Sequence, residues 1–131
     1  MKSKKCDELV LEIGSLIVNS EAYAKYEWQG ISVVGHFSQG ERSTSGYVYL
    51  DDGDFQAETP GFDALYKVEE LREEMKKETD KAWHQCLIHV TKPDFKINIQ
   101  FEYDDPKRWS LKKISRDVSD HAESLKPLMA K

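Results

Sequence analysis

Histidine and cysteine, side chains that commonly bind transition metals, lie close together at His84, Cys86 and His89. Apolar and polar residues alternate through this stretch, and that period of two predicts a β-strand. Because successive side chains of a strand point to opposite faces, His84 and Cys86 share one face and His89 lies on the other. Three ligands that cannot converge do not form a metal site, so we predict no metal and no cofactor.

Acidic side chains form two dense groups outside the charged helix described below. They are Asp51, Asp52 and Asp54, and Glu102, Asp104 and Asp105. The first group lacks the alternating acids and the distant closing glutamate of a calcium loop, so we predict a polar β-turn and call it the acidic turn. The second group, the acidic corner, offers carboxylates for general acid–base chemistry. Carboxylates that alternate with core residues more often form a solvated or partner-facing surface. We therefore predict that these six acids are candidate partner-binding residues and that one of the two groups faces a basic partner.

Motifs for nucleophilic or nucleotide-dependent catalysis are missing from the sequence. There is no G-x-S-x-G sequence, no Walker loop and no dinucleotide-binding fingerprint. Cys86 lies on the apolar face of its strand, which predicts a core position, and Cys6 at the start of a helix is the better candidate for a reactive thiol. We therefore predict that the chain is not an enzyme.

Length and charge narrow the classes of function. A chain of 131 residues can form one domain with its own core, and no linker or repeat divides residues 1–131. The formal net charge of −5 argues against non-specific nucleic-acid binding and against attachment to an anionic membrane, since both need a basic face. With two cysteines and no continuous apolar leader, the expected compartment is the cytoplasm.

The elements that must position these groups are organised around residues 81–109, which predict two strands joined by a turn at 91–94. The second strand ends before Pro106, and its apolar face carries Ile97, Ile99, Phe101 and Tyr103. The first strand carries Cys86, Ile88 and Val90 on its apolar face. By the same alternation its opposite face carries Trp83, Gln85, Leu87 and His89.

Three helices and a second hairpin complete the predicted fold. The helices cover about 7–20, about 62–80, and a stretch that starts between Ser110 and Ser115 and is stopped by Pro127. The second helix has the apolar stripe Phe62, Leu65, Val68, Leu71 and Met75, and the third has Ile114, Val118, Ala122 and Leu125. Strands cover about 27–37 and 44–50, followed by an irregular or extended piece through Thr59. The order α-β-β-α-β-β-α predicts an α+β fold, one antiparallel sheet of about four to five strands packed with helices.

Three segments carry a resemblance to a known family. They are G-Y-V-Y-L-D-D-G (46–53), L-R-E-E-M (71–75) followed by Trp83, and F-K-I-N-I-Q-F-E-Y-D-D-P (95–106) with Trp109 close behind. Over residues 30–109 or so, the chain resembles the YezG-like immunity proteins, small cytoplasmic antidotes encoded beside polymorphic or contact-dependent toxins. The resemblance implies a non-enzymatic protein that binds and neutralises one cognate toxin domain, and it carries over no individual binding residue.

Two other classes of function stay open. A compact acidic domain could bind a basic toxin such as a nuclease. The same features would also be expected of a protein-interaction module unrelated to toxins. An enzyme or small-ligand binder could use the sheet face lined by Trp83 and Leu87, and a deep pocket with converging carboxylates would favour that reading. The sequence also leaves the oligomeric state open.

Overall fold

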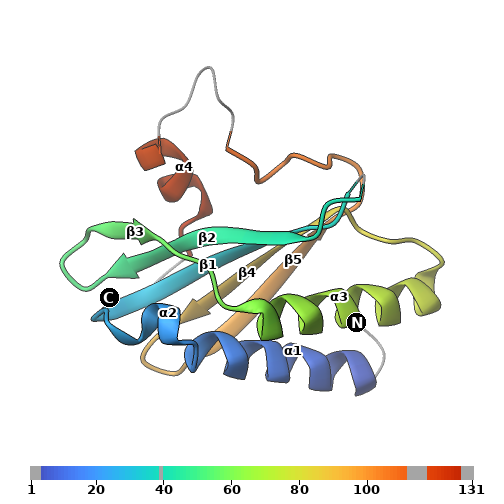
Figure 1. Cartoon of the computed structure of the whole chain (residues 1–131), viewed down its shortest axis with the longest axis horizontal. Helices are drawn as coiled ribbons and strands as arrows, with labels where there is room; N and C mark the ends of the chain where they lie inside the picture. Colours follow the sequence, from blue (N-terminus) through green and yellow to red (C-terminus); the bar gives the residue numbers. More distant parts are fainter. Residues whose placement is uncertain (1–3, 39, 112–117, 128–131) are drawn as a thin grey trace.

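A computed structural model describes residues 4–38, 40–111 and 118–127 of the chain (Figure 1). The helices in these ranges are α1 (Lys4–Val18), α2 (Glu21–Ala24), α3 (Phe62–Thr79) and α4 (Val118–Leu125). The strands are β1 (Trp28–His36), β2 (Ser43–Leu50), β3 (Phe55–Ala57), β4 (Gln85–Thr91) and β5 (Lys96–Glu102). No helix within these ranges is long and apolar enough to cross a membrane.

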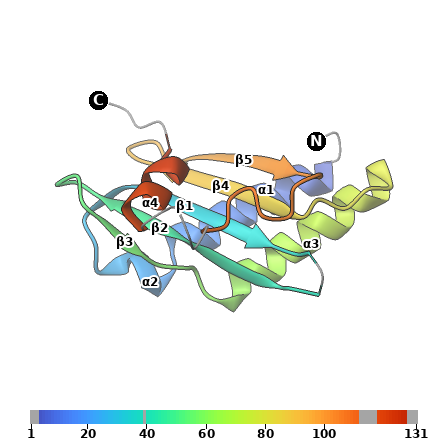
Figure 2. The ribbon, with the colours of Figure 1, turned by 90° about the horizontal axis from the view of Figure 1, so that it is seen from above.

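The strands form one antiparallel five-stranded sheet in the order β3-β2-β1-β4-β5. Helices α1 and α3 lie side by side on one face of the sheet, and α4 lies over the other face (Figures 1 and 2). The predicted α+β class is confirmed, and the extended piece before Thr59 contains the short edge strand β3. Helix α2 was not predicted; it is a single helical turn that Ser20 caps by accepting a hydrogen bond from the Ala22 N–H.

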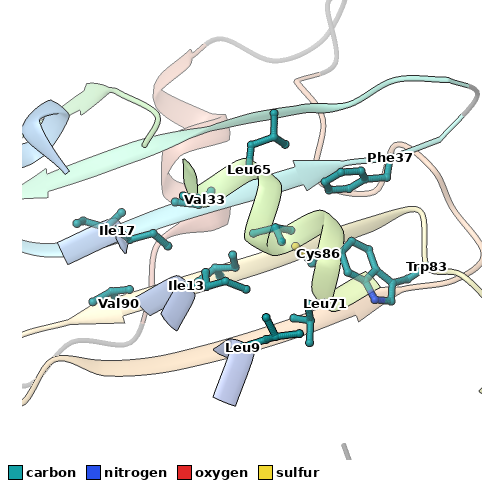
Figure 3. Close-up of a cluster of buried hydrophobic side chains, with 14 of the residues drawn as sticks. Leu9, Ile13, Ile17, Val33, Phe37, Leu65, Leu71, Trp83, Cys86 and Val90 are labelled. Carbon is teal, nitrogen blue, oxygen red and sulfur yellow. The ribbon is translucent and has the colours of Figure 1, made fainter. Parts of the chain in front are cut away.

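The larger core lies between the sheet and the two long helices (Figure 3). Apolar residues at helical spacing turn one side of α1 and of α3 toward the sheet. The residues of this helix-side core that Figure 3 labels are Leu9, Ile13, Ile17, Val33, Phe37, Leu65, Leu71, Trp83, Cys86 and Val90. Strand alternation correctly predicted the sheet's contribution, including Cys86, Ile88 and Val90.

A second, smaller core lies on the other face of the sheet. It consists of Val34, Tyr47, Tyr49, Leu87, Trp109, Ala122 and Leu125. Strand β1, at the centre of the sheet, is therefore covered on both faces, and eight of its nine residues are buried. In this second core, Trp109 and two residues of α4, Ala122 and Leu125, pack against residues of β1, β2 and β4.

Several side chains lie elsewhere than the sequence patterns predicted. Trp83 belongs to the helix-side core, 5.6 Å from the Phe37 ring, because β4 begins only at Gln85 and the strand alternation does not reach Trp83. Phe62 and Val118 are exposed because each is the first residue of its helix. Ser110 lies before the last helix rather than in it.

Only part of the predicted last helix lies within the described residues. Its predicted first residues between 112 and 115, and the apolar Ile114, lie outside the described residues. Ala122 and Leu125 face the sheet as predicted.

Candidate functional site

The acidic turn and the acidic corner lie at opposite corners of the sheet. Pairing of Trp28 with Leu50 and of Gly30 with Thr91 places the acidic turn, which follows Leu50, at one end of the strands. Pairing of Gln85 with Glu102 places the acidic corner at the other end. The two groups also flank opposite edges of the sheet. With strands about 4.8 Å apart and a rise of about 3.3 Å per residue, they are separated by roughly 30 Å. The structure does not bring them together.

The acidic turn is held by its own backbone. Leu50 donates its N–H to the Asp54 carbonyl at 2.8 Å, and Gly53 donates to the Leu50 carbonyl at 3.0 Å. The Asp52 carboxylate accepts the Asp54 N–H at 2.9 Å. Gly53 has φ +92°, a left-handed conformation that glycine adopts without strain. The predicted polar turn is confirmed, and its fixed backbone defines where the carboxylates point.

The carboxylates of the acidic turn face solvent. Asp51, Asp52 and Asp54 are all exposed. Within the described ranges, none of the three forms an ion pair with a lysine, arginine or histidine. The turn therefore presents uncompensated negative charge at the surface of the molecule.

The acidic corner differs because its first carboxylate is already engaged. Glu102 accepts hydrogen bonds from the N–H groups of Asp104 and Asp105, at 2.9 and 3.1 Å, and from Arg108 Nη1 at 2.9 Å. These donors, the backbone N–H groups first, lower the pKa of Glu102 to about 2. A carboxyl with such a pKa stays ionised and donates no proton near neutral pH. Asp104 and Asp105 remain exposed.

A buried polar network on the second face of the sheet was not predicted. Gln85 is fully buried, and its side-chain amide nitrogen donates to His36 Nδ1 and to Ser110 Oγ, both at 2.9 Å. Its carbonyl oxygen accepts the Trp109 N–H at 2.8 Å. Strand alternation predicted that Gln85 lies on this face, but its partners on β1 and on the segment after β5 depend on tertiary packing.

Two histidines of this network line a hollow of about 560 Å³ beside Tyr47. His36 accepts from Gln85 at Nδ1 and so donates from Nε2 to Ser45 Oγ at 2.8 Å. His121 donates from Nε2 to the Trp109 carbonyl at 2.9 Å and accepts from Tyr47 Oη at Nδ1, at 2.7 Å. All four ring nitrogens are engaged within the protein. Neither His36 nor His121 therefore has a ring nitrogen without an internal hydrogen bond.

Further polar contacts fasten α4 to the sheet. Tyr49 Oη donates to the Ala122 carbonyl at 2.6 Å, and His89 Nε2 donates to the Leu125 carbonyl at 2.7 Å. Burial lowers the pKa of His89, although the Leu125 carbonyl acts in the opposite direction. These contacts show that polar side chains on this face of the sheet hold α4 in place.

Cys86 and His89 of β4 do not converge on a common point. Cys86 is fully buried on the helix side, where burial raises the pKa of its thiol to about 12, and His89 lies on the opposite face. Throughout the part of the chain that the structure describes, no group of three or more His, Cys, Asp or Glu side chains could hold a metal ion. Cys6, the better candidate for a reactive thiol, is also fully buried, and its Sγ donates to the Glu78 carboxylate at 3.0 Å.

The small-ligand face suggested by Trp83 and Leu87 does not exist. Trp83 lies on the helix side, whereas Leu87 lies on the other face and packs with Trp109 and Leu125. A hollow of about 690 Å³ lies elsewhere, between the end of α1, α2 and the start of α3. Its two carboxylates, Glu21 and Asp63, each stand in the first turn of a helix, a position favoured by the helix dipole.

An exposed aromatic pair at the rim of this hollow is a feature that sequence reasoning missed. The rings of Phe62 and Tyr66 stack with centroids 6.2 Å apart, and the side chains are 72% and 53% exposed. The Arg42 guanidinium lies 5.8 Å from the Tyr66 ring and binds both carboxylate oxygens of Glu69 at 2.6 Å. Exposed aromatics beside an arginine are enriched at protein interfaces. The available signal was the position of Phe62 at the helix start.

No family model matches the chain, and no curated protein matches it either. The assignment of a function therefore depends on the geometry described above and on the family resemblance of the sequence.

Proposed function

We propose that this chain is a cytoplasmic immunity protein that binds one cognate bacterial toxin domain and neutralises it, and that the toxin surface it binds is basic, as in a nuclease. The family resemblance supplies the role. The surface chemistry supports it, because uncompensated acids attract a partner that carries the positive charge needed to bind phosphate.

One observation carries the proposal. Asp51, Asp52 and Asp54 stand exposed and without ion-pair partners within the described ranges, on a turn whose backbone is fixed by hydrogen bonds. Charges held in fixed positions match a partner without the entropy cost of ordering a loop. In the acidic corner, by contrast, Arg108 already compensates Glu102. We therefore assign the toxin contact to the acidic turn and treat Asp104 and Asp105 as the comparison surface.

The first experiment is co-purification of the chain with the product of the gene next to its own. A stable complex, together with protection of cells that express that gene product, supports the immunity role. If the neighbouring product is not a toxin, or if it neither binds nor is neutralised, the immunity role is wrong, and a protein-interaction module unrelated to toxins becomes the better reading.

The second experiment locates the contact. In the variant Asp51→Asn, Asp52→Asn, Asp54→Asn, the asparagine oxygens keep the acceptors of the turn while the charges are lost. We expect the association rate constant with the neighbouring gene product to fall about tenfold or more at low salt, and its salt dependence to flatten. Stopped-flow or surface-sensor kinetics over a salt series measure both quantities.

The matched control is Asp104→Asn, Asp105→Asn, which removes exposed acids from the opposite corner and leaves Glu102 intact. We expect it to associate like the wild type. If the control slows association and the acidic-turn variant does not, the contact lies at the acidic corner. If neither variant changes the rate at any salt concentration, the electrostatic part of the proposal fails, and the Phe62–Tyr66 pair is the next surface to test.

A further inference from the structure

Strand β5 forms an open edge of the sheet. It pairs with β4 along its whole length, and in the described part of the chain no segment pairs with its other side. Folded proteins usually protect such an edge with a charge, a proline or a bulge, because its free backbone groups pair readily with another strand. The interior of β5, Ile97–Phe101, has no charge and no proline, and its register with β4 is unbroken. The interior of the β5 edge therefore lacks the features that usually prevent pairing with another strand.

The direction of the free backbone groups follows from one hydrogen bond. The Glu102 carbonyl accepts the His84 N–H at 2.8 Å and therefore points toward β4. Backbone groups of an antiparallel strand alternate in direction from residue to residue. The N–H and C=O groups of Ile97, Ile99 and Phe101 consequently point outward, away from the sheet.

The sequence of β5, K-I-N-I-Q-F-E, complements itself when it is read in the opposite direction. Antiparallel pairing with an identical strand about Ile99 sets Ile99 opposite Ile99, and Ile97 opposite Phe101. On the other face it sets Asn98 opposite Gln100. At both ends Lys96 lies opposite Glu102, a carboxylate that Arg108 of its own copy already binds. Each of these cross-strand pairs is of a stabilising or neutral kind, and no like charges are opposed.

Exposed apolar groups continue this edge on the helix side. Leu11, in the middle of α1, is 68% exposed, and Phe95, just before β5, is 49% exposed. Both line a hollow of about 220 Å³ together with Gly14 and Ile97. A Cβ at Gly14 would lie 3.0 Å from Ile97 Cδ1, so the glycine allows α1 to pack closely over β5. Apolar surface beside an open strand adds a hydrophobic contribution to pairing.

We propose that the β5 edge binds β5 of a second copy of this chain, antiparallel and centred on Ile99, so that two five-stranded sheets join into one continuous sheet. The proposal does not rest on the immunity role. It requires only the free edge, the outward backbone groups and the self-complementary side chains. Strand addition of this kind takes its affinity from main-chain hydrogen bonds and its register from side-chain pairs.

The test uses the full chain and two double variants at exposed positions. Asn98→Lys with Gln100→Lys opposes lysine to lysine at both Asn98–Gln100 pairs of the proposed register. Asn98→Lys with Gln100→Glu opposes lysine to glutamate at the same pairs. Both side chains are exposed in the single copy, so circular dichroism should show the wild-type fold in each variant. Sedimentation equilibrium over a range of concentrations measures the mass.

We expect the wild type and the Lys/Glu variant to approach twice the chain mass of 15.2 kDa as concentration rises, while the Lys/Lys variant stays at the mass of one copy. A wild type that is monomeric at every concentration overturns the proposal. A dimer that survives in the Lys/Lys variant places the interface elsewhere and also overturns it. If both variants are monomeric, the proposed antiparallel register is wrong.

Discussion

Glu102 is the last residue of β5, and its carboxylate is held by the loop that follows. The N–H groups of Asp104 and Asp105 and the guanidinium of Arg108 all donate to it. Only the ionised carboxylate accepts all of these bonds well, and that is why the pKa of Glu102 falls to about 2. One acid of the acidic corner thereby stabilises the loop in addition to carrying surface charge.

Replacing Glu102 by Gln should destabilise the protein near neutral pH, and the loss should shrink in acid. The folded pKa lies below the usual value of 4.5, so the carboxylate's contribution to stability is fully present above that value and is lost as the pH falls through about 2. Urea unfolding of wild type and variant near pH 7 and near pH 2.5 measures the change. Asp104→Asn, at an exposed neighbour, is the control. A destabilisation that is equal at both pH values would contradict this account.

Phe101 and Phe62 form a matched pair of phenylalanines in different surroundings. Phe101 packs against the helix-side core with its ring 5.3 Å from that of Trp83, while Phe62 is 72% exposed. A phenylalanine in a full interior costs about 3–5 kcal/mol when cut to alanine, but Phe101 is only partly buried, so we expect about 2 kcal/mol. Phe62→Ala should change the free energy of unfolding by less than about 0.5 kcal/mol. Equal losses in urea melts would show that the two burial environments are misassigned.

At the scale of elements, α4 is held to the sheet mainly by groups on the strands. His89 and Tyr49 each donate to a carbonyl of α4, and His121 joins α4 to Tyr47. The helix has only eight residues, too few to be stable alone in water. Its docking therefore depends on the side-chain contacts that the strands supply.

Stability should fall as the pH drops below the usual histidine pKa of 6.5. Burial lowers the pKa of His36 and of His89, so the unfolded chain takes up protons first, and the stability present above pH 6.5 declines below it. Thermal melts between about pH 8 and about pH 5.5 measure this decline. In His89→Gln the amide still donates to Leu125 but does not titrate, so the decline should be shallower than in the wild type. An unchanged slope would exclude His89 as a cause.

At the scale of the whole molecule, the two proposals use opposite edges of one sheet. The acidic turn joins β2 to β3 at one edge, and the proposed pairing uses β5 at the other. In a pair of copies joined through β5, the two acidic turns lie farthest from the shared axis. A toxin domain bound at the acidic turn would therefore leave the β5 edge free, and the two tests can be read separately.

The sequence by itself determined the local periodicities of this protein. The period of two predicted that Cys86, Ile88 and Val90 share one apolar face, and the helical stripe of α3 from Leu65 to Met75 predicted part of the helix layer that covers it. The polar turn at Asp51–Asp54 was equally local. Such features depend on neighbours within a few residues, so the chain order is enough to predict them.

Only the tertiary structure decided which groups meet. Gln85, Glu102 and the helix-capping positions show this, because each finds its partners through packing and loop paths that periodicity does not encode. Trp83 and Phe62 were assigned to the wrong surroundings because a periodic pattern does not say where an element begins. The separation of the two acidic groups follows from strand order. Strand order is set by long-range pairing, whose free energy comes from burying both faces of β1.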